Sequence, residues 1–143
     1  MPAYETDEAR LEVPERWIDR SVNSLEYTRP EGVVRVIVQR KPRGASALAE
    51  LSRDRVIEMR RRLAGFELLR EEDVLVAGRP AADVAVRYQD HEEHLYQRTI
   101  SLLVGAKLVT VGVIAPVSLI AQADQMLQQV RATLVIRRDA ETP

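Results

Sequence analysis

The chain has 143 residues, of which 45% are hydrophobic and 30% are charged, the balance of a soluble globular protein with a buried core. Its formal net charge of -1 excludes a global positive field that would recruit nucleic acid or an anionic membrane. The chain contains no cysteine, which excludes disulfides and Cys-ligated metal sites. We therefore expect one domain over residues 1–143.

The N-terminal segment MPAYETDEAR has neither the basic region nor the apolar region of a secretory signal. No apolar run approaches the roughly 20 residues of a membrane-spanning helix. We therefore expect a cytoplasmic protein that does not insert stably into a membrane.

Alternation of apolar and polar residues predicts strands in the first third of the chain. The first covers residues 4–13 and is closed by Pro14, and the second covers residues 19–28. The turn signal Arg29-Pro30-Glu31-Gly32 separates the second from a third strand over residues 33–40.

An amphipathic helix is predicted after a loop over residues 41–45. Ser46 is its N-cap candidate and Gly65 its C-terminal stop. Its buried stripe should consist of Leu48, Leu51, Val56, Met59 and Leu63.

The second half of the chain is predicted to hold four strands and a helix. Residues 66–76 and 82–88 are strands joined by a turn at Gly78-Arg79-Pro80, and residues 90–93 turn the chain into a hairpin. The final helix covers residues 116–133. Its inward residues should be Ile120, Ala123, Leu127 and Val130. The order β-β-β-α-β-β-β-β-α predicts an α+β fold, an antiparallel sheet with two helices.

The hairpin from Leu95 to Ala115 has two distinct faces. Gly105 suits the first central position of a type II′ turn, which pairs Val104 with Lys107. One face is then an ordinary core, formed by Ile100, Leu102, Val109, Val111 and Val113. The other, here called the mixed face, collects Gln97, Thr99, Ser101, Leu103, Leu108, Thr110, Gly112 and Ile114.

The mixed face is apolar at its ends and carries small hydroxyls, an amide and a glycine between them. It can therefore accept an apolar partner, offer hydrogen bonds, and allow a close backbone approach at Gly112. A moderately polar, exposed sheet face is the alternative that the pattern alone leaves open. If both helices cover the core face, the mixed face stays bare, and such a bare face usually marks an interface.

Catalytic and metal-binding patterns are weak. His91 and His94 fall in a predicted turn with no third histidine, so we expect no metal site. The arginines of the first helix, Arg53, Arg55 and residues 60–62, point around it and indicate a solvated surface. Because Gly-x-Ser-x-Gly and glycine-rich phosphate loops are absent, we expect neither enzymatic activity nor a cofactor.

One motif carries a family resemblance. It is Pro14-x-x-Trp17-x-Asp19-x-Ser21-Val22-Asn23, followed by Val36-Ile37-Val38-Gln39-Arg40. With it the chain resembles the DcrB-like family and, within that family, the Eag chaperones of type VI secretion. The resemblance extends over the whole chain in length and element order. It implies a Mog1/PsbP-like fold and a single DcrB-like chaperone domain.

The resemblance also implies a function and a site. Eag chaperones are cytoplasmic homodimers that bind and shield the N-terminal transmembrane helices of effectors, of PAAR or Rhs type, before loading on the secretion spike. The family's client groove corresponds here to Val22 and Ser24, and Ile37 adds apolar contact. Gln39 and Gln97 correspond to the groove residues that hydrogen-bond to the client.

Two other interpretations stay open. One is a PsbP-like accessory subunit or a DcrB-type envelope protein, against which we weigh the missing signal peptide and lipobox cysteine. The other is an enzyme or small-ligand carrier that uses the open sheet face as a pocket.

Overall fold

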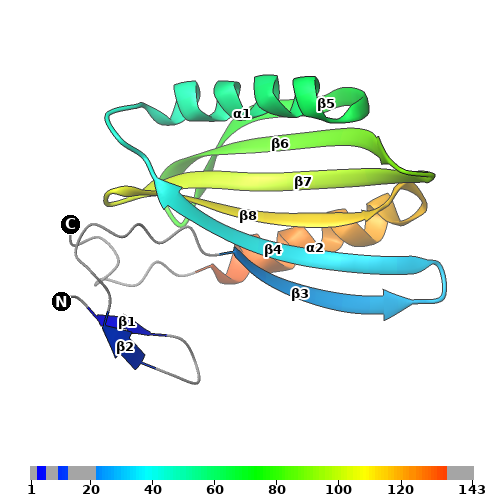
Figure 1. Ribbon diagram of the computed structural model, residues 1–143, viewed down its shortest axis with the longest axis horizontal. Helices are drawn as coiled ribbons and strands as arrows, with labels where there is room; N and C mark the ends of the chain where they lie inside the picture. Colours follow the sequence, from blue (N-terminus) through cyan, green and yellow to red (C-terminus); the bar gives the residue numbers. More distant parts are fainter. Residues whose placement is uncertain (1–2, 6–9, 13–21, 135–143) are drawn as a thin grey trace.

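The computed structural model describes residues 3–5, 10–12 and 22–134. Its main body is a six-stranded antiparallel sheet in the order β3-β4-β8-β7-β6-β5 (Figure 1). The strands are β3 (Val22–Arg29), β4 (Gly32–Pro42), β5 (Ala64–Val76), β6 (Arg79–Asp90), β7 (Glu93–Val104) and β8 (Lys107–Pro116). The helices are α1 (Leu48–Arg62) and α2 (Ile120–Thr133), and a short 3₁₀ helix, η1 (Val117–Leu119), precedes α2. The predicted α+β class is confirmed.

The N-terminal residues form a separate two-stranded sheet. Its strands are β1 (Ala3–Glu5) and β2 (Arg10–Glu12), and Tyr4 lies opposite Leu11. The prediction of one strand over residues 4–13 was therefore wrong. Two short strands that pair with each other satisfy backbone groups that a lone strand would leave to solvent. Pro14, Trp17 and the C-terminal tail lie outside the described residues.

The register of the predicted hairpin is confirmed. Val104 pairs with Lys107, and Gly105 between them has a φ of 58°, as the first central position of a type II′ turn requires. Cross-strand partners share a face of the sheet, so the core face and the mixed face divide as expected.

Helix α2 covers the core face. Ala123 and Leu127 are buried against the sheet, in one cluster with the predicted core residues Ile100, Leu102 and Val113. Of all the predicted core residues, Ile100, Leu102, Val111 and Val113 are buried, and Val109 is half-buried.

An ion network under α2 ties this helix to the sheet. The Arg98 guanidinium donates to both carboxylate oxygens of Asp83, at 2.7 and 3.0 Å, and to Asp124 of α2 at 3.2 Å. The Tyr96 hydroxyl donates to the same Asp124 at 2.6 Å. The hydrogen bond to Asp83 raises the pKa of Arg98, while burial and the bond to Asp124 raise that of Tyr96. The positive charge of Arg98 is therefore neutralised by the carboxylates of Asp83 and Asp124.

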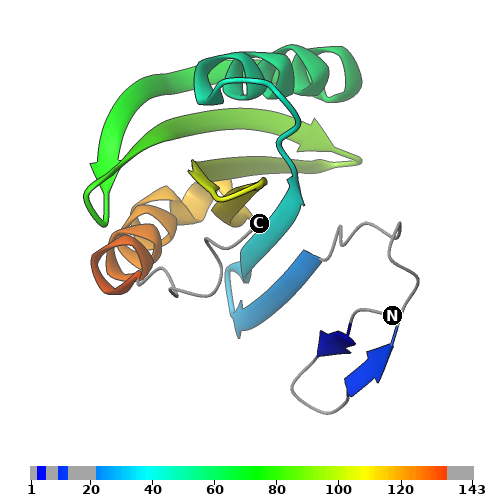
Figure 2. The same cartoon turned by 90° about the vertical axis from the view of Figure 1, so that its left-hand side faces the viewer.

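Helix α1 covers part of the mixed face. Its buried residues Val56 and Met59 pack on Val84, Val86 and Tyr88 of β6. The two helices thus lie on opposite faces of the sheet, and the mixed face is not left bare (Figure 2). Because α1 packs over β5, β6 and β7, the part of this face that α1 leaves uncovered lies over β8, β4 and β3.

The ends of α1 differ from the predicted ones. Ala47 occupies the N-cap without a side-chain hydrogen bond, so Ser46 does not cap the helix. The helix ends at Arg62, and Leu63 is already extended. Gly65, with a φ of 62°, lies in β5, where the pairing with β6 shifts register. The glycine that suggested a helix stop thus belongs to an irregularity of the strand, which its positive φ accommodates.

Candidate binding groove

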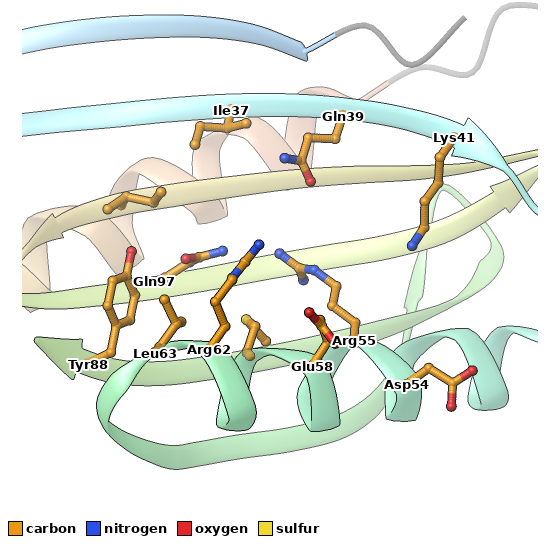
Figure 3. A pocket seen from close by; sticks show the side chains of 12 residues that line it. Ile37, Gln39, Lys41, Asp54, Arg55, Glu58, Arg62, Leu63, Tyr88 and Gln97 are labelled. Carbon is orange, nitrogen blue, oxygen red and sulfur yellow. The ribbon is translucent and has the colours of Figure 1, made fainter. Parts of the chain in front are cut away.

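The uncovered part of the mixed face forms a groove between α1 and β4, with β7 and β8 as its floor (Figure 3). Its cavity has a volume of about 560 Å³. The lining residues are Ile37, Gln39, Lys41, Asp54, Arg55, Glu58, Met59, Arg62, Leu63, Tyr88, Gln97 and Ile114. A small recess of about 20 Å³ continues the floor to Thr99, Thr110 and Gly112.

Strand register brings these residues together. Ile37 pairs with Gly112, and Gln39 pairs with Thr110, because β4 lies beside β8. Ile114 in turn pairs with Gln97 of β7. Residues two apart on β4 point to the same side, so Lys41 joins this row.

The two glutamines have amides available for a ligand. Gln39 and Gln97 both line the cavity, and neither makes a side-chain hydrogen bond to another of the residues that the structure describes. Arg98, the neighbour of Gln97, faces α2 on the opposite side of the sheet. Gln97 is therefore the residue of β7 that a groove ligand can reach.

The predicted hydroxyls are already engaged within the protein. Ser101 and Thr110 are both buried, and their hydroxyls lie 3.0 Å apart, within hydrogen-bonding distance. Thr99 accepts a hydrogen bond from Arg55. Among the polar residues predicted on the mixed face, the groove thus offers chiefly the glutamine amides.

Gly112 serves a packing contact inside the sheet. A Cβ at this position would lie 2.7 Å from the Cγ2 methyl of Thr99 and 3.3 Å from the Arg98 carbonyl oxygen. The space beside the glycine is filled by its cross-strand neighbour. The close backbone approach expected at Gly112 would meet that methyl group.

Two predicted site residues lie on the edge strand β3. Ser24 is exposed and pairs with Ile37, and Val22 pairs with Gln39. Both therefore continue the rows of the groove floor across β4. The side chain of Val22 is not among those that the structure describes.

The charged wall of the groove was missed by sequence analysis. Arg55, Met59 and Arg62 lie at spacings of four and three residues, so they share one stripe of α1. This periodicity was visible in the sequence, but the arginines were assigned to a solvated surface. Leu63 and Tyr88 were not assigned to the site either, and they add apolar surface to the groove.

Arg55 is the most unusual charge in the groove. Its Nη1 donates to Thr99 Oγ1 at 2.6 Å, and it makes no ion pair with any residue of the described part of the chain. Burial, and then the like charge of Arg62, lower the pKa of Arg55 below its usual value. The guanidinium stays charged and has donors left for an acceptor.

A second hollow, of about 490 Å³, lies near the β6–β7 turn and includes Glu31, Asp90, Glu93 and His94. Within residues 3–5, 10–12 and 22–134, no group of three or more His, Asp or Glu side chains could hold a metal ion. His91 and His94 are both exposed at the turn. That this protein needs no metal stays a prediction.

The described residues form an α+β fold with a groove on one face of its main sheet. A family model described as DcrB matches residues 8–139, so the chain belongs to the DcrB family. Comparison with the curated proteins gives no match. Among residues 3–5, 10–12 and 22–134, no helix has the length and apolar character needed to cross a membrane.

Two solved structures are similar to this one. The first is PA94 from Pseudomonas aeruginosa, a protein of unknown function, with a TM-score of 0.83 and 21% identity over 96% of this chain and 97% of that one. The second is LpqN of Mycobacterium tuberculosis, involved in cell envelope biogenesis, with a TM-score of 0.57 and 13% identity over 81% and 80%. At these identities the likeness concerns the fold.

Proposed function

We propose that this protein is an Eag-type chaperone of type VI secretion. It would bind the N-terminal transmembrane segment of a PAAR or Rhs effector in the cytoplasm and shield it until the effector is loaded on the secretion spike. The observation that carries this proposal is the groove, where Ile37 and Ile114 lie beside the side-chain amides of Gln39 and Gln97, which have no hydrogen-bond partner among the described residues. Family membership is consistent with it.

The physical requirements of such a client match these side chains. A membrane segment in water exposes apolar side chains, and covering them contributes roughly 25 cal/mol per Å² of apolar area. Its Ser, Thr or backbone polar groups need partners once they are covered, because an unpaired buried group costs about 1–3 kcal/mol. The glutamine amides of the groove can both donate and accept.

A small-ligand carrier is the second candidate. The groove volume of about 560 Å³ lies within the range of small-molecule pockets, roughly 300–1,000 Å³. A bound metabolite in purified protein, together with no affinity for an effector segment, would favour this candidate. Neither candidate requires catalytic turnover, a metal or a cofactor.

The proposal is tested with N-terminal transmembrane segments of PAAR or Rhs effectors from the same organism, each fused to a soluble carrier. Ile37→Asn places an amide in the groove without adding charge, and we expect capture to fall at least tenfold. The matched control is Ile57→Asn, since Ile57 is 44% exposed on α1 and does not line the groove. Gln97→Ala should weaken capture less, by about 1–2 kcal/mol.

Thermal melting must show that each variant is folded before a loss of binding is assigned to a contact. If folded Ile37→Asn protein captures the segment as well as wild type, the client does not use this groove. If wild-type protein captures no segment, the chaperone function itself is wrong.

A further inference from the structure

We infer that the groove binds its client in one orientation, with a carboxylate of the client between Arg55 and Lys41. This inference rests on the proposed function and adds the direction in which the client segment lies in the groove. It predicts an apolar segment that carries an acidic residue near one end, with the apolar part lying toward Leu63 and Tyr88.

The groove has an apolar end and a cationic end. Along one face of β4 the side chains follow in the order Ile37, Gln39, Lys41, so the strand changes from apolar to charged within one row. Leu63 and Tyr88 lie at one end of the groove and Lys41 at the other, and the guanidinium groups of Arg55 and Arg62 lie between them (Figure 3). A ligand that is apolar along its whole length would leave these cations covered without a partner.

No residue that the structure describes forms an ion pair with Arg55. Among these residues its side chain donates to the neutral hydroxyl of Thr99, and the like charge of Arg62 acts on it. Arg98, on the other face of the sheet, has two aspartates as partners, Asp83 and Asp124. The fold therefore neutralises the buried Arg98 with two aspartates, whereas the guanidinium of Arg55 can still bind an external anion.

Two acidic side chains of α1 also line the cavity. Asp54 points away from the groove in Figure 3. Glu58 lies on the same stretch of helix as Arg55, yet it makes no ion pair with any residue among those described. Both are exposed, and a solvated carboxylate beside a guanidinium contributes little. A client carboxylate that enters the groove can instead bind in a bidentate fashion, away from water.

The test uses three capped helical peptides of leucine, alanine and glycine, labelled with a neutral fluorophore and kept soluble by a polyethylene glycol tail. One carries Glu near its N-terminus, one carries Glu near its C-terminus, and the third has Gln at both positions. We expect wild-type protein to bind one Glu peptide at least tenfold tighter than the Gln peptide. The other Glu peptide should gain no more than threefold.

Arg55→Gln should abolish this preference, and Arg55→Lys should retain part of it, because lysine keeps the charge but not the planar donor pair. The matched control is Arg61→Gln, which removes an exposed charge from the same helix outside the groove. Lys41→Gln, on an exposed side chain, serves as a second variant if Arg55→Gln does not fold. It should reduce the preference at least threefold.

The outcomes separate the two proposals. Equal binding of all three peptides overturns the orientation while leaving the chaperone function intact. A preference that survives in both Arg55→Gln and Lys41→Gln overturns the assignment to these cations. Failure of all three peptides to bind overturns both proposals.

Discussion

Arg55 of α1 and Thr99 of β7 are joined by a hydrogen bond of 2.6 Å that runs from the guanidinium to the threonine hydroxyl across the floor of the groove. This contact holds a charged side chain over the sheet, where a solvated helix surface had been predicted. Thr99 also packs against Gly112, so one side chain links the helix wall of the groove to its floor.

Replacing the Thr99 hydroxyl should weaken this link. We expect Thr99→Val to lower the free energy of unfolding by about 1 kcal/mol, because a part-buried guanidinium loses its acceptor. Thr99→Ser keeps the hydroxyl and serves as the control. Urea denaturation of the three proteins provides the measurement. Equal stability of the Val variant and wild type would mean that water replaces the bond at no cost.

Gly112→Ala should be destabilising, because its Cβ would lie 2.7 Å from the Thr99 methyl. Overpacking of this kind costs about 1–3 kcal/mol. In a Thr99→Ser background that methyl is absent, so the same substitution should cost clearly less. A double-mutant cycle by chemical denaturation measures the difference. Equal costs in both backgrounds would show that the Arg98 carbonyl, 3.3 Å away, is the limiting contact.

The buried pair of Asp83 and Arg98 should matter for stability far more than the surface pairs. Asp83→Ala leaves the Arg98 guanidinium without its main partner, and breaking such a pair costs about 3–5 kcal/mol. Glu72→Ala removes an exposed partner of Arg70 and should change stability by no more than about 0.5 kcal/mol. If thermal denaturation gives the two variants similar stabilities, the network under α2 does not hold the helix.

The raised pKa of Tyr96 predicts that the folded state loses stability at alkaline pH. Burial and the hydrogen bond to Asp124 raise its pKa above the ordinary value of 10.0, so the folded state holds the phenolic proton more tightly than the unfolded state. The resulting stabilisation is complete below about pH 10 and is lost as the pH rises toward the folded-state pKa. The slope is at most about 1.4 kcal/mol per pH unit.

Urea denaturation between pH 9 and 11 tests this prediction for wild type and Tyr96→Phe. The stability of the phenylalanine variant should fall less steeply, because it has no phenol at this position. Parallel curves for the two proteins would contradict the assignment to Tyr96.

We predict that the protein is a homodimer, because a monomer would leave the apolar side chains of the groove in water and each copy could hold one client helix. Light scattering over a wide concentration range, with and without an effector segment, provides the measurement. A strict monomer under both conditions would contradict the prediction.

Local patterns were sufficient for much of the fold. The alternation on either side of Gly105 predicted the pairing of Val104 with Lys107, and with it which residues of β7 and β8 share a face. Such information is local because the period of two and a tight turn set the register of a hairpin. The helix stop at Gly65 failed for the opposite reason, since pairing with β6 determined the conformation there.

The groove depends on contacts between distant segments. Adjacent residues showed that Gln97 and Thr99 lie on one face, but the pairing of β4 with β8 placed Gln39 beside them. The side on which α1 packs followed from how Val56 and Met59 fit against β6, and that packing turned Arg55 into the groove. An arginine in a helix has the same local pattern whether it faces water or a sheet, so tertiary packing alone decided its role.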